Sequence, residues 1–144
     1  MSFSLDANLL IYASDKSSPF HPAAKQFLVD CLNGFETVYI AWPTAMAYLR
    51  IVTHPSIFSE PLPPREATRN IEALQQNRVV RFITETEDFW AAYQTISHEQ
   101  PIRGNLVPDA HLAALLKVNG VKTLYTHDRD FRRFDFLRIK DPLA

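Results

Sequence analysis

Residues 3–12 read Phe-Ser-Leu-Asp-Ala-Asn-Leu-Leu-Ile-Tyr, an apolar stub that ends in an acid and is followed by a second apolar run. We interpret Ser2 to Leu5 as a buried strand with Asp6 at its carboxyl end, and the residues from Ala7 onward as a short helix. In an open parallel sheet, ligands bind in the crevice beyond the carboxyl ends of the strands. Asp6 is therefore a candidate site residue. The alternative is that it only caps the helix, because Asp is a favoured N-cap residue.

Segments with strand and helix character alternate along the rest of the chain. Further strands are expected at 37–41, 78–83 and 121–125, with an edge strand at 137–139. Helices are expected at 21–33, 43–52, 65–76, 88–99 and 109–118, the last with Pro108 as its first residue. This alternation requires crossover connections and a parallel sheet. The sequence therefore predicts one α/β domain over residues 1–144, a three-layer α/β/α fold around a central parallel sheet of four or five strands.

Charge and cysteine content exclude little. The chain has 16 Asp and Glu residues against 15 Lys and Arg residues, so net charge predicts no partner. The single Cys31 lies in an apolar helical stretch and is expected to be a reduced, buried thiol. No basic-then-apolar leader begins the sequence, and no apolar run is long enough to span a bilayer. The expectation is a cytoplasmic protein without a membrane association.

Three acids occupy comparable places in the predicted fold. Asp6 follows the first strand, Asp128 follows the fourth, and Asp109 stands in the first turn of a helix. Carboxylates that converge at one sheet edge repel one another, and a divalent cation relieves that repulsion. Oxygen ligands favour Mg²⁺, or Mn²⁺, over zinc, and such an ion suits phosphate chemistry. The alternative is purely structural, since Asp109 is favoured by the helix dipole and Asp128 or Asp130 by capping.

Four stretches then carry a resemblance to a known family. They are Asp6–Tyr12, Leu49–Pro55, Pro108–Ala114 and Thr126–Phe131. Together, in this order and at these separations, they resemble PIN-domain ribonucleases, and especially the VapC toxins of bacterial toxin–antitoxin pairs. The likeness covers essentially the whole chain.

The resemblance implies a Mg²⁺- or Mn²⁺-dependent endoribonuclease that cleaves RNA, commonly tRNA or ribosomal RNA. It also implies silencing by a VapB-type antitoxin and a homodimeric assembly. Carried over by motif, the catalytic, metal-binding acids are Asp6, Asp109 and Asp128, and the supporting residues are Asn8, Thr126 and Asp130.

The chain departs from the family pattern at one position. Many members carry a Glu on the helix after the second strand, and here Tyr48 takes that place. A phenol with a pKa near ~10 is a poor ligand for a hard cation at neutral pH. Asp130 is the candidate replacement for the missing charge. The departure leaves open a degenerate PIN domain that binds RNA or a partner without cleavage.

Basic and aromatic residues near the acids are further candidates. We interpret Arg50 as a salt-bridge partner for an acid of the cluster or for a helix end, with a bidentate phosphate contact as the alternative. Residues 129–140 form a dense basic stretch, in which we take the phenylalanines as core and the arginines as a candidate RNA-binding edge. The substrate-binding candidates there are Arg129, Arg132 and Arg133, and the aromatic residues assigned to core are Phe131, Phe134 and Phe136.

Other side chains have weaker assignments. His111 and His127 flank the acids. We interpret each as an ordinary surface or supporting group, and the alternative is a proton shuttle near neutral pH. Four aromatic residues are assigned to core or to an interface such as an antitoxin helix: Trp42, Phe89, Trp90 and Tyr93.

Two other enzyme and signalling classes fit less well. A small metal-dependent phosphatase of the haloacid-dehalogenase type needs Asp-x-Asp after the first strand, but Asn8 holds the third position. A receiver-like signalling module needs an acceptor Asp after the third strand, and Thr84-Glu85-Thr86 offers none.

Overall fold

A single five-stranded parallel sheet forms the centre of the molecule, in the order β3-β2-β1-β4-β5. The structure is a computed structural model and describes residues 1–143. The strands are β1 (Ser2–Leu5), β2 (Thr37–Ala41), β3 (Val80–Ile83), β4 (Thr123–Tyr125) and β5 (Arg138–Lys140). The predicted strands are therefore present, including the fifth one at an edge.

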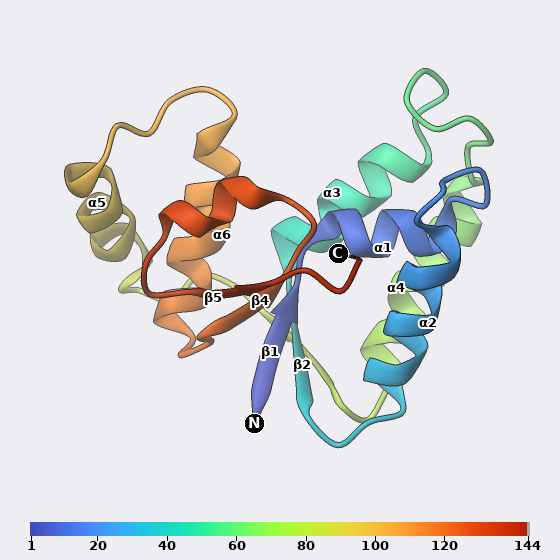
Figure 1. The fold of residues 1–144 in the computed structure, drawn as a ribbon, viewed down its shortest axis with the longest axis horizontal. Helices are drawn as coiled ribbons and strands as arrows, with labels where there is room; N and C mark the ends of the chain where they lie inside the picture. Colours follow the sequence, from blue (N-terminus) through green and yellow to red (C-terminus); the bar gives the residue numbers. More distant parts are fainter. Residues whose placement is uncertain (144) are drawn as a thin grey trace.

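Helices cover both faces of this sheet (Figure 1). They are α1 (Ala7–Ser14), α2 (His21–Leu32), α3 (Trp42–Val52), α4 (Pro64–Gln76), α5 (Phe89–Glu99) and α6 (Leu106–Val118), with a 3₁₀ helix η1 (Arg129–Arg133) before β5. One apolar cluster joins the sheet to α1, α2, α3 and α4, and a second joins it to α5, α6 and η1. The predicted three-layer α/β/α fold is confirmed.

The chain order of the strands creates a switch point beside β1. The chain runs outward from β1 through β2 to β3, and then returns by α5 and α6 to β4 on the other side of β1. At such a reversal the crevice beyond the strand ends is open to a ligand. The backbone N–H of Asp6 donates to the carbonyl of Tyr125 at 3.0 Å, so the residues that follow β1 and β4 meet at this point.

Helix α6 is the most enclosed of the elements around the switch point. Five consecutive residues, 112–116, are at most 5% exposed, because the sheet, α5 and η1 cover this helix on several sides. The helix begins at Leu106, two residues before the expected start, so Pro108 is its third residue. Proline is tolerated there because the first four backbone N–H groups of a helix have no intrahelical acceptor.

Several burial assignments from the sequence need adjustment. Phe131 and Phe134 are 2% exposed, as expected for core residues, but Phe136 is only half-buried beneath the Lys117 ammonium. Trp90 is 61% exposed and stacks on Tyr93. The free Cys31 is half-buried, and burial, reinforced by neighbouring acids, raises the pKa of its thiol to about 12. Within residues 1–143, no helix has the length and apolar character needed to cross a membrane.

Candidate metal centre

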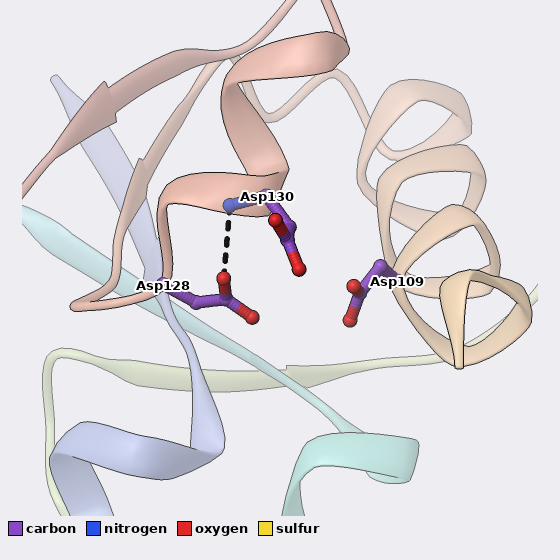
Figure 2. Close-up of side chains that lie close together, drawn as sticks. All are labelled: Asp109, Asp128 and Asp130. Atoms are coloured by element: carbon purple, nitrogen blue, oxygen red, sulfur yellow. Dashed lines mark hydrogen bonds between the residues drawn. The ribbon is translucent and has the colours of Figure 1, made fainter.

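Three carboxylates from separate parts of the chain face one another at the switch point. Asp109 comes from the first turn of α6, Asp128 from the loop after β4, and Asp130 from η1. One carboxylate oxygen from each lies within 4.8 Å of the others. Figure 2 shows the three side chains turned toward a common space, with the backbone N–H of Asp130 donating to Asp128 Oδ1 at 2.9 Å. Asp128 thus caps η1 and still presents its other oxygen to the cluster.

Asp6 lies beside this group but is held differently. Its Oδ1 accepts from the Ala7 N–H at 2.7 Å, which caps α1, and its Oδ2 accepts from the Thr126 hydroxyl at 2.8 Å. Asp6 is not one of the three mutually close acids, although its charge acts on Asp109. The capping alternative from the sequence is therefore real for Asp6, and it coexists with a place at the acidic centre.

The buried Thr126 hydroxyl joins the elements that carry these acids. Besides donating to Asp6, it accepts from the Asp128 N–H at 3.0 Å and from Asn8 Nδ2 at 3.2 Å. The other amide atom, Asn8 Oδ1, is buried and finds no partner among the described residues. A buried acceptor left unsatisfied is costly, so this oxygen fits a water molecule or a hydrated ion at the centre.

The cluster is short of positive charge. Burial first, and then the charges of Asp128, Asp6 and Asp130, raise the pKa of Asp109 to about 6, while Arg133 opposes the rise. Burial also raises the pKa of Asp6 against the hydrogen bonds from Thr126 and Ala7. A divalent cation relieves both effects, and a donor set made only of oxygen atoms fits Mg²⁺ or Mn²⁺. The residues present therefore fit such an ion.

Comparison with known proteins now identifies the fold family. The family model described as the PIN domain matches residues 4–137. Ribonuclease VapC48 of Mycobacterium tuberculosis is 44% identical over 144 residues, which span 100% of this chain and 99% of that protein. This chain belongs to the PIN-domain family. Within that family it belongs to the VapC ribonucleases.

Solved structures agree on the architecture. VapBC-1 from nontypeable Haemophilus influenzae matches with a TM-score of 0.68 and 19% identity, covering 100% of both chains. Mycobacterium tuberculosis VapC20, named as a sarcin-ricin loop cleaving toxin, matches with a TM-score of 0.67 and 16% identity, covering 91% of this chain and 93% of that one. At these identities the likeness shows that the PIN fold is shared.

Tyr48, which takes the sequence place of the PIN-family Glu, is bonded to residues outside the acidic cluster. Its hydroxyl lies 2.7 Å from the Ser14 hydroxyl and accepts from Asn70 Nδ2 at 2.9 Å. Ser14 is the last residue of α1 and Asp6 is its N-cap, so Ser14 and Asp6 lie about 12 Å apart along the helix axis. The side chain of Tyr48 is thus turned into a groove beside α4, away from the acids.

The arginines of this PIN domain divide into two groups. Arg50 is exposed, and the ion pairs found within residues 1–143 all involve histidine, so its expected pairing with an acid of the cluster is wrong. It stands in the last turn of α3, the helix-end position that was its other expected place. Arg129, Arg132 and Arg133 are exposed on η1, next to Asp128 and Asp130. Arg133 comes near the centre: its Nε donates to the Asp130 carbonyl at 3.2 Å, and its charge lowers the pKa of Asp109.

Both histidines near the acids are engaged by carboxylates that the sequence analysis did not single out. His111 Nε2 lies 2.6 Å from Glu85 Oε1, and His127 Nδ1 lies 2.8 Å from Asp141 Oδ2. Each ring therefore has a carboxylate partner outside the acidic cluster. No local pattern would have revealed Glu85 or Asp141, because each pair joins two loops or elements that are distant in sequence.

Proposed function

We propose that this protein is a Mg²⁺-dependent endoribonuclease toxin that hydrolyses RNA phosphodiester bonds, with Mn²⁺ as an alternative ion. Its metal-holding, catalytic acids are Asp6, Asp109 and Asp128. The observation that carries the proposal is the convergence of carboxylates from α6, the β4 loop and η1 within 4.8 Å. The identity with Ribonuclease VapC48 supports RNA as the substrate.

Each residue of the centre has a distinct task in this reaction. Asp109 on α6 and Asp128 after β4 would hold the ion, and Asp130 would add a third carboxylate in place of the family acid missing from α3. Asp6 adds its negative charge from the end of β1, where Thr126 and the Ala7 N–H fix its carboxylate. A divalent cation bound there lowers the pKa of the attacking water and neutralises charge on the phosphoryl oxygens.

The RNA backbone binds along η1. The exposed guanidinium groups of Arg129, Arg132 and Arg133 stand beside the acids, at a place where they can contact phosphates on either side of the cleaved bond. Structured RNA of the tRNA or ribosomal class is the proposed target. The fold shared with VapC20, which is named as a sarcin-ricin loop cleaving toxin, supports this choice.

A cleavage assay tests the proposed chemistry. End-labelled tRNA and ribosomal RNA are incubated with the purified protein in EDTA, in Mg²⁺ and in Mn²⁺, alongside the Asp6→Ala and Asp128→Asn variants. We expect cleavage only with a divalent ion, and a loss of about 100-fold or more in each variant. Circular dichroism checks that the variants remain folded. Cleavage in EDTA, or by Asp128→Asn at the wild-type rate, would reject the metal mechanism, and RNA binding without cleavage would establish the degenerate PIN domain.

A groove away from the acids fits the antitoxin partner. It has a volume of about 920 Å³ and is lined by α1, α2, α4 and the segment before α4. Its apolar lining includes Leu28, Leu32 and Leu74, and charged side chains of both signs, such as Lys25 and Glu66, stand around them. This combination suits an amphipathic helix. The VapBC-1 complex, with its matching fold, supports a VapB-type antitoxin as the occupant.

Two valines offer a matched test of this groove. Val29 lines the groove, Val107 lies outside it, and both are 42% exposed. We expect Val29→Lys to weaken binding of the cognate antitoxin by 10-fold or more, because a charged side chain replaces an apolar one that the partner would bury. Val107→Lys is expected to bind it unchanged. Equal affinities in calorimetry for the two variants would place the antitoxin elsewhere.

The protein is further proposed to form a homodimer. Met46 on α3 and Trp90 on α5 are 51% and 61% exposed, and large apolar side chains of this kind are enriched at interfaces. Light scattering after size-exclusion chromatography is expected to give twice the monomer mass. A monomer mass across the micromolar range would contradict this assembly.

A further inference from the structure

The loop that carries Asp128 lies between two regular elements. Strand β4 ends at Tyr125 and η1 begins at Arg129, so Thr126, His127 and Asp128 belong to neither. Asp109, by contrast, sits within α6, whose backbone hydrogen bonds already fix its position. The geometry of the acidic centre therefore depends on whatever holds residues 126–128.

The segment after β5 holds this loop from one side. The Thr126 N–H donates to the Lys140 carbonyl at 2.9 Å, and the next residue, His127, bonds through Nδ1 to Asp141 Oδ2 at 2.8 Å. Asp141 is itself fixed, because its Oδ1 accepts from the Leu143 N–H at 2.9 Å. Its side chain is only 18% exposed. The two residues immediately before Asp128 are thus tied to one short stretch of chain.

Aromatic rings hold the same histidine from the other side. The centroid of the His127 ring lies 4.6 Å from that of Phe20 and 6.1 Å from that of Tyr12. These two residues belong to the α1–α2 region and also pack on each other. The His127 ring is therefore held between the segment after β5 and the α1–α2 region.

We propose that Asp141, acting through His127, is a positioning residue that holds the Asp128 carboxylate in register with Asp109 and Asp130. Asp141 does not belong to the acidic cluster itself, and its role is distinct from that of a metal ligand. Groups that orient a ligand-bearing residue commonly change metal affinity by 10-fold or more when they are removed. This inference rests on the proposed function only in taking the cluster to be a cation site.

A second histidine–carboxylate pair provides an internal control. Glu85 and His111 are as close as Asp141 and His127, and their side chains are 38% and 34% exposed. His111 lies on α6, so its contact with Glu85 adds nothing that the helix does not already supply to Asp109. Glu85→Ala also removes a carboxylate that is bound to a histidine near the acidic centre. It leaves the loop that carries Asp128 unchanged, so it serves as the control.

The experiment compares Mn²⁺ binding by the metal-free wild type, four single variants and one double variant, at one neutral pH, by calorimetry and by electron paramagnetic resonance. We expect Asp141→Ala to bind Mn²⁺ about 10-fold more weakly and Glu85→Ala to bind it as the wild type does. Asp141→Asn is expected to fall between the wild type and Asp141→Ala, because its single side-chain oxygen replaces only one of the two acceptors that serve His127 and the Leu143 N–H. His127→Phe keeps a ring between Phe20 and Tyr12 and is expected to match Asp141→Ala. The double variant Asp141→Ala/His127→Phe should bind Mn²⁺ no more weakly than either single variant.

Cleavage kinetics and stability complete the test. In Asp141→Ala, higher Mn²⁺ should restore kcat, with KM for RNA unchanged, and the melting temperature in EDTA identifies any variant that does not fold. Wild-type Mn²⁺ affinity in Asp141→Ala, or an equal loss in Glu85→Ala, would overturn the positioning role. Should Asp141→Ala not fold, His127→Phe decides by the same comparison. Absence of Mn²⁺ binding by the wild type would instead overturn the metal centre itself, so the two failures are distinguishable.

Discussion

Asp109 shows how the surroundings of a single residue prepare this site for a cation. Burial and three neighbouring carboxylates raise the pKa of Asp109 from 3.8 to about 6. The folded protein therefore holds the Asp109 proton more tightly than the unfolded chain does. The free energy of unfolding that depends on this group is fully present below about pH 4 and is lost as the pH rises through about 6.

The first prediction follows from this sign. In EDTA, wild-type stability should fall relative to that of Asp109→Asn between about pH 4 and pH 6, by on the order of 1 kcal/mol, because solvent screens a half-exposed carboxylate. Mg²⁺ affinity of the wild type should rise over the same range, since the ion competes with the proton. Urea unfolding of both proteins across this range measures the difference. Parallel stability curves would show that the pKa of Asp109 is not raised.

The Thr126 hydroxyl is the second test at the residue scale. Thr126→Val keeps the shape of the side chain but leaves Asp6 Oδ2 and the Asp128 N–H without their partner. We expect a loss of about 2 kcal/mol in the free energy of unfolding and about 10-fold in kcat. Thr126→Ser retains the hydroxyl and should behave like the wild type within about 0.5 kcal/mol. Urea unfolding in EDTA and single-turnover cleavage are the measurements, and a fully active Thr126→Val would remove Thr126 from the centre.

At the scale of elements, α3 shows that the rotation of a helix decides which side chains reach the site. Ala45, Tyr48 and Val52 face the core, so Tyr48 extends toward α1 and α4. The family pattern places an acid at this position of α3. The face of the helix that carries Tyr48 is turned toward Ser14 and Asn70 and not toward the acidic cluster. Tyr48 therefore serves the packing of α3 against α1 and α4.

The third prediction concerns this helix. Tyr48→Phe removes the hydrogen bonds to Ser14 and Asn70 and should lower the free energy of unfolding by about 1 kcal/mol. RNA cleavage and Mn²⁺ affinity should stay at wild-type values, because the hydroxyl does not face the acids. Thermal unfolding and calorimetry measure the two effects separately. A loss of Mn²⁺ affinity with unchanged stability would put Tyr48 back at the metal centre.

At the scale of the whole molecule, the strand order makes the site. The reversal between β1 and β4 brings α1, the β4 loop and α6 together at the carboxyl edge of the sheet, where the acids repel one another. This repulsion lowers the stability of the folded state. The two apolar clusters on opposite faces of the sheet offset the loss. A bound cation removes that cost and should stabilise the folded state as a whole.

The fourth prediction is a metal-linked rise in stability. At 100 times the dissociation constant, Mg²⁺ or Mn²⁺ should add about 2.7 kcal/mol to the free energy of unfolding. Asp128→Asn should lose this gain but retain its stability in EDTA, because Asn also accepts a capping hydrogen bond. Differential scanning calorimetry with and without the ion measures both quantities. An equal rise in the variant would place the bound ion outside the cluster.

The sequence by itself determined the elements and their approximate ends. Alternating runs, turn residues and caps act over a few residues, so β1 and β2 are found at their predicted bounds. The same local logic placed Asp6 and Asp128 at strand ends and therefore at one edge of a parallel sheet. Local signals were weaker at α6, where a proline inside the first turn was taken as its start.

Only the tertiary structure decided which side chains meet. It placed Asp130, and not Asp6, in the closest group of acids, directed Tyr48 into the groove, and paired His127 with Asp141. Thr126 and Asp6, which share a hydrogen bond, are separated by 120 positions. Such contacts depend on helix rotation, side-chain rotamers and the packing of distant segments, and no pattern within a short stretch of sequence encodes them.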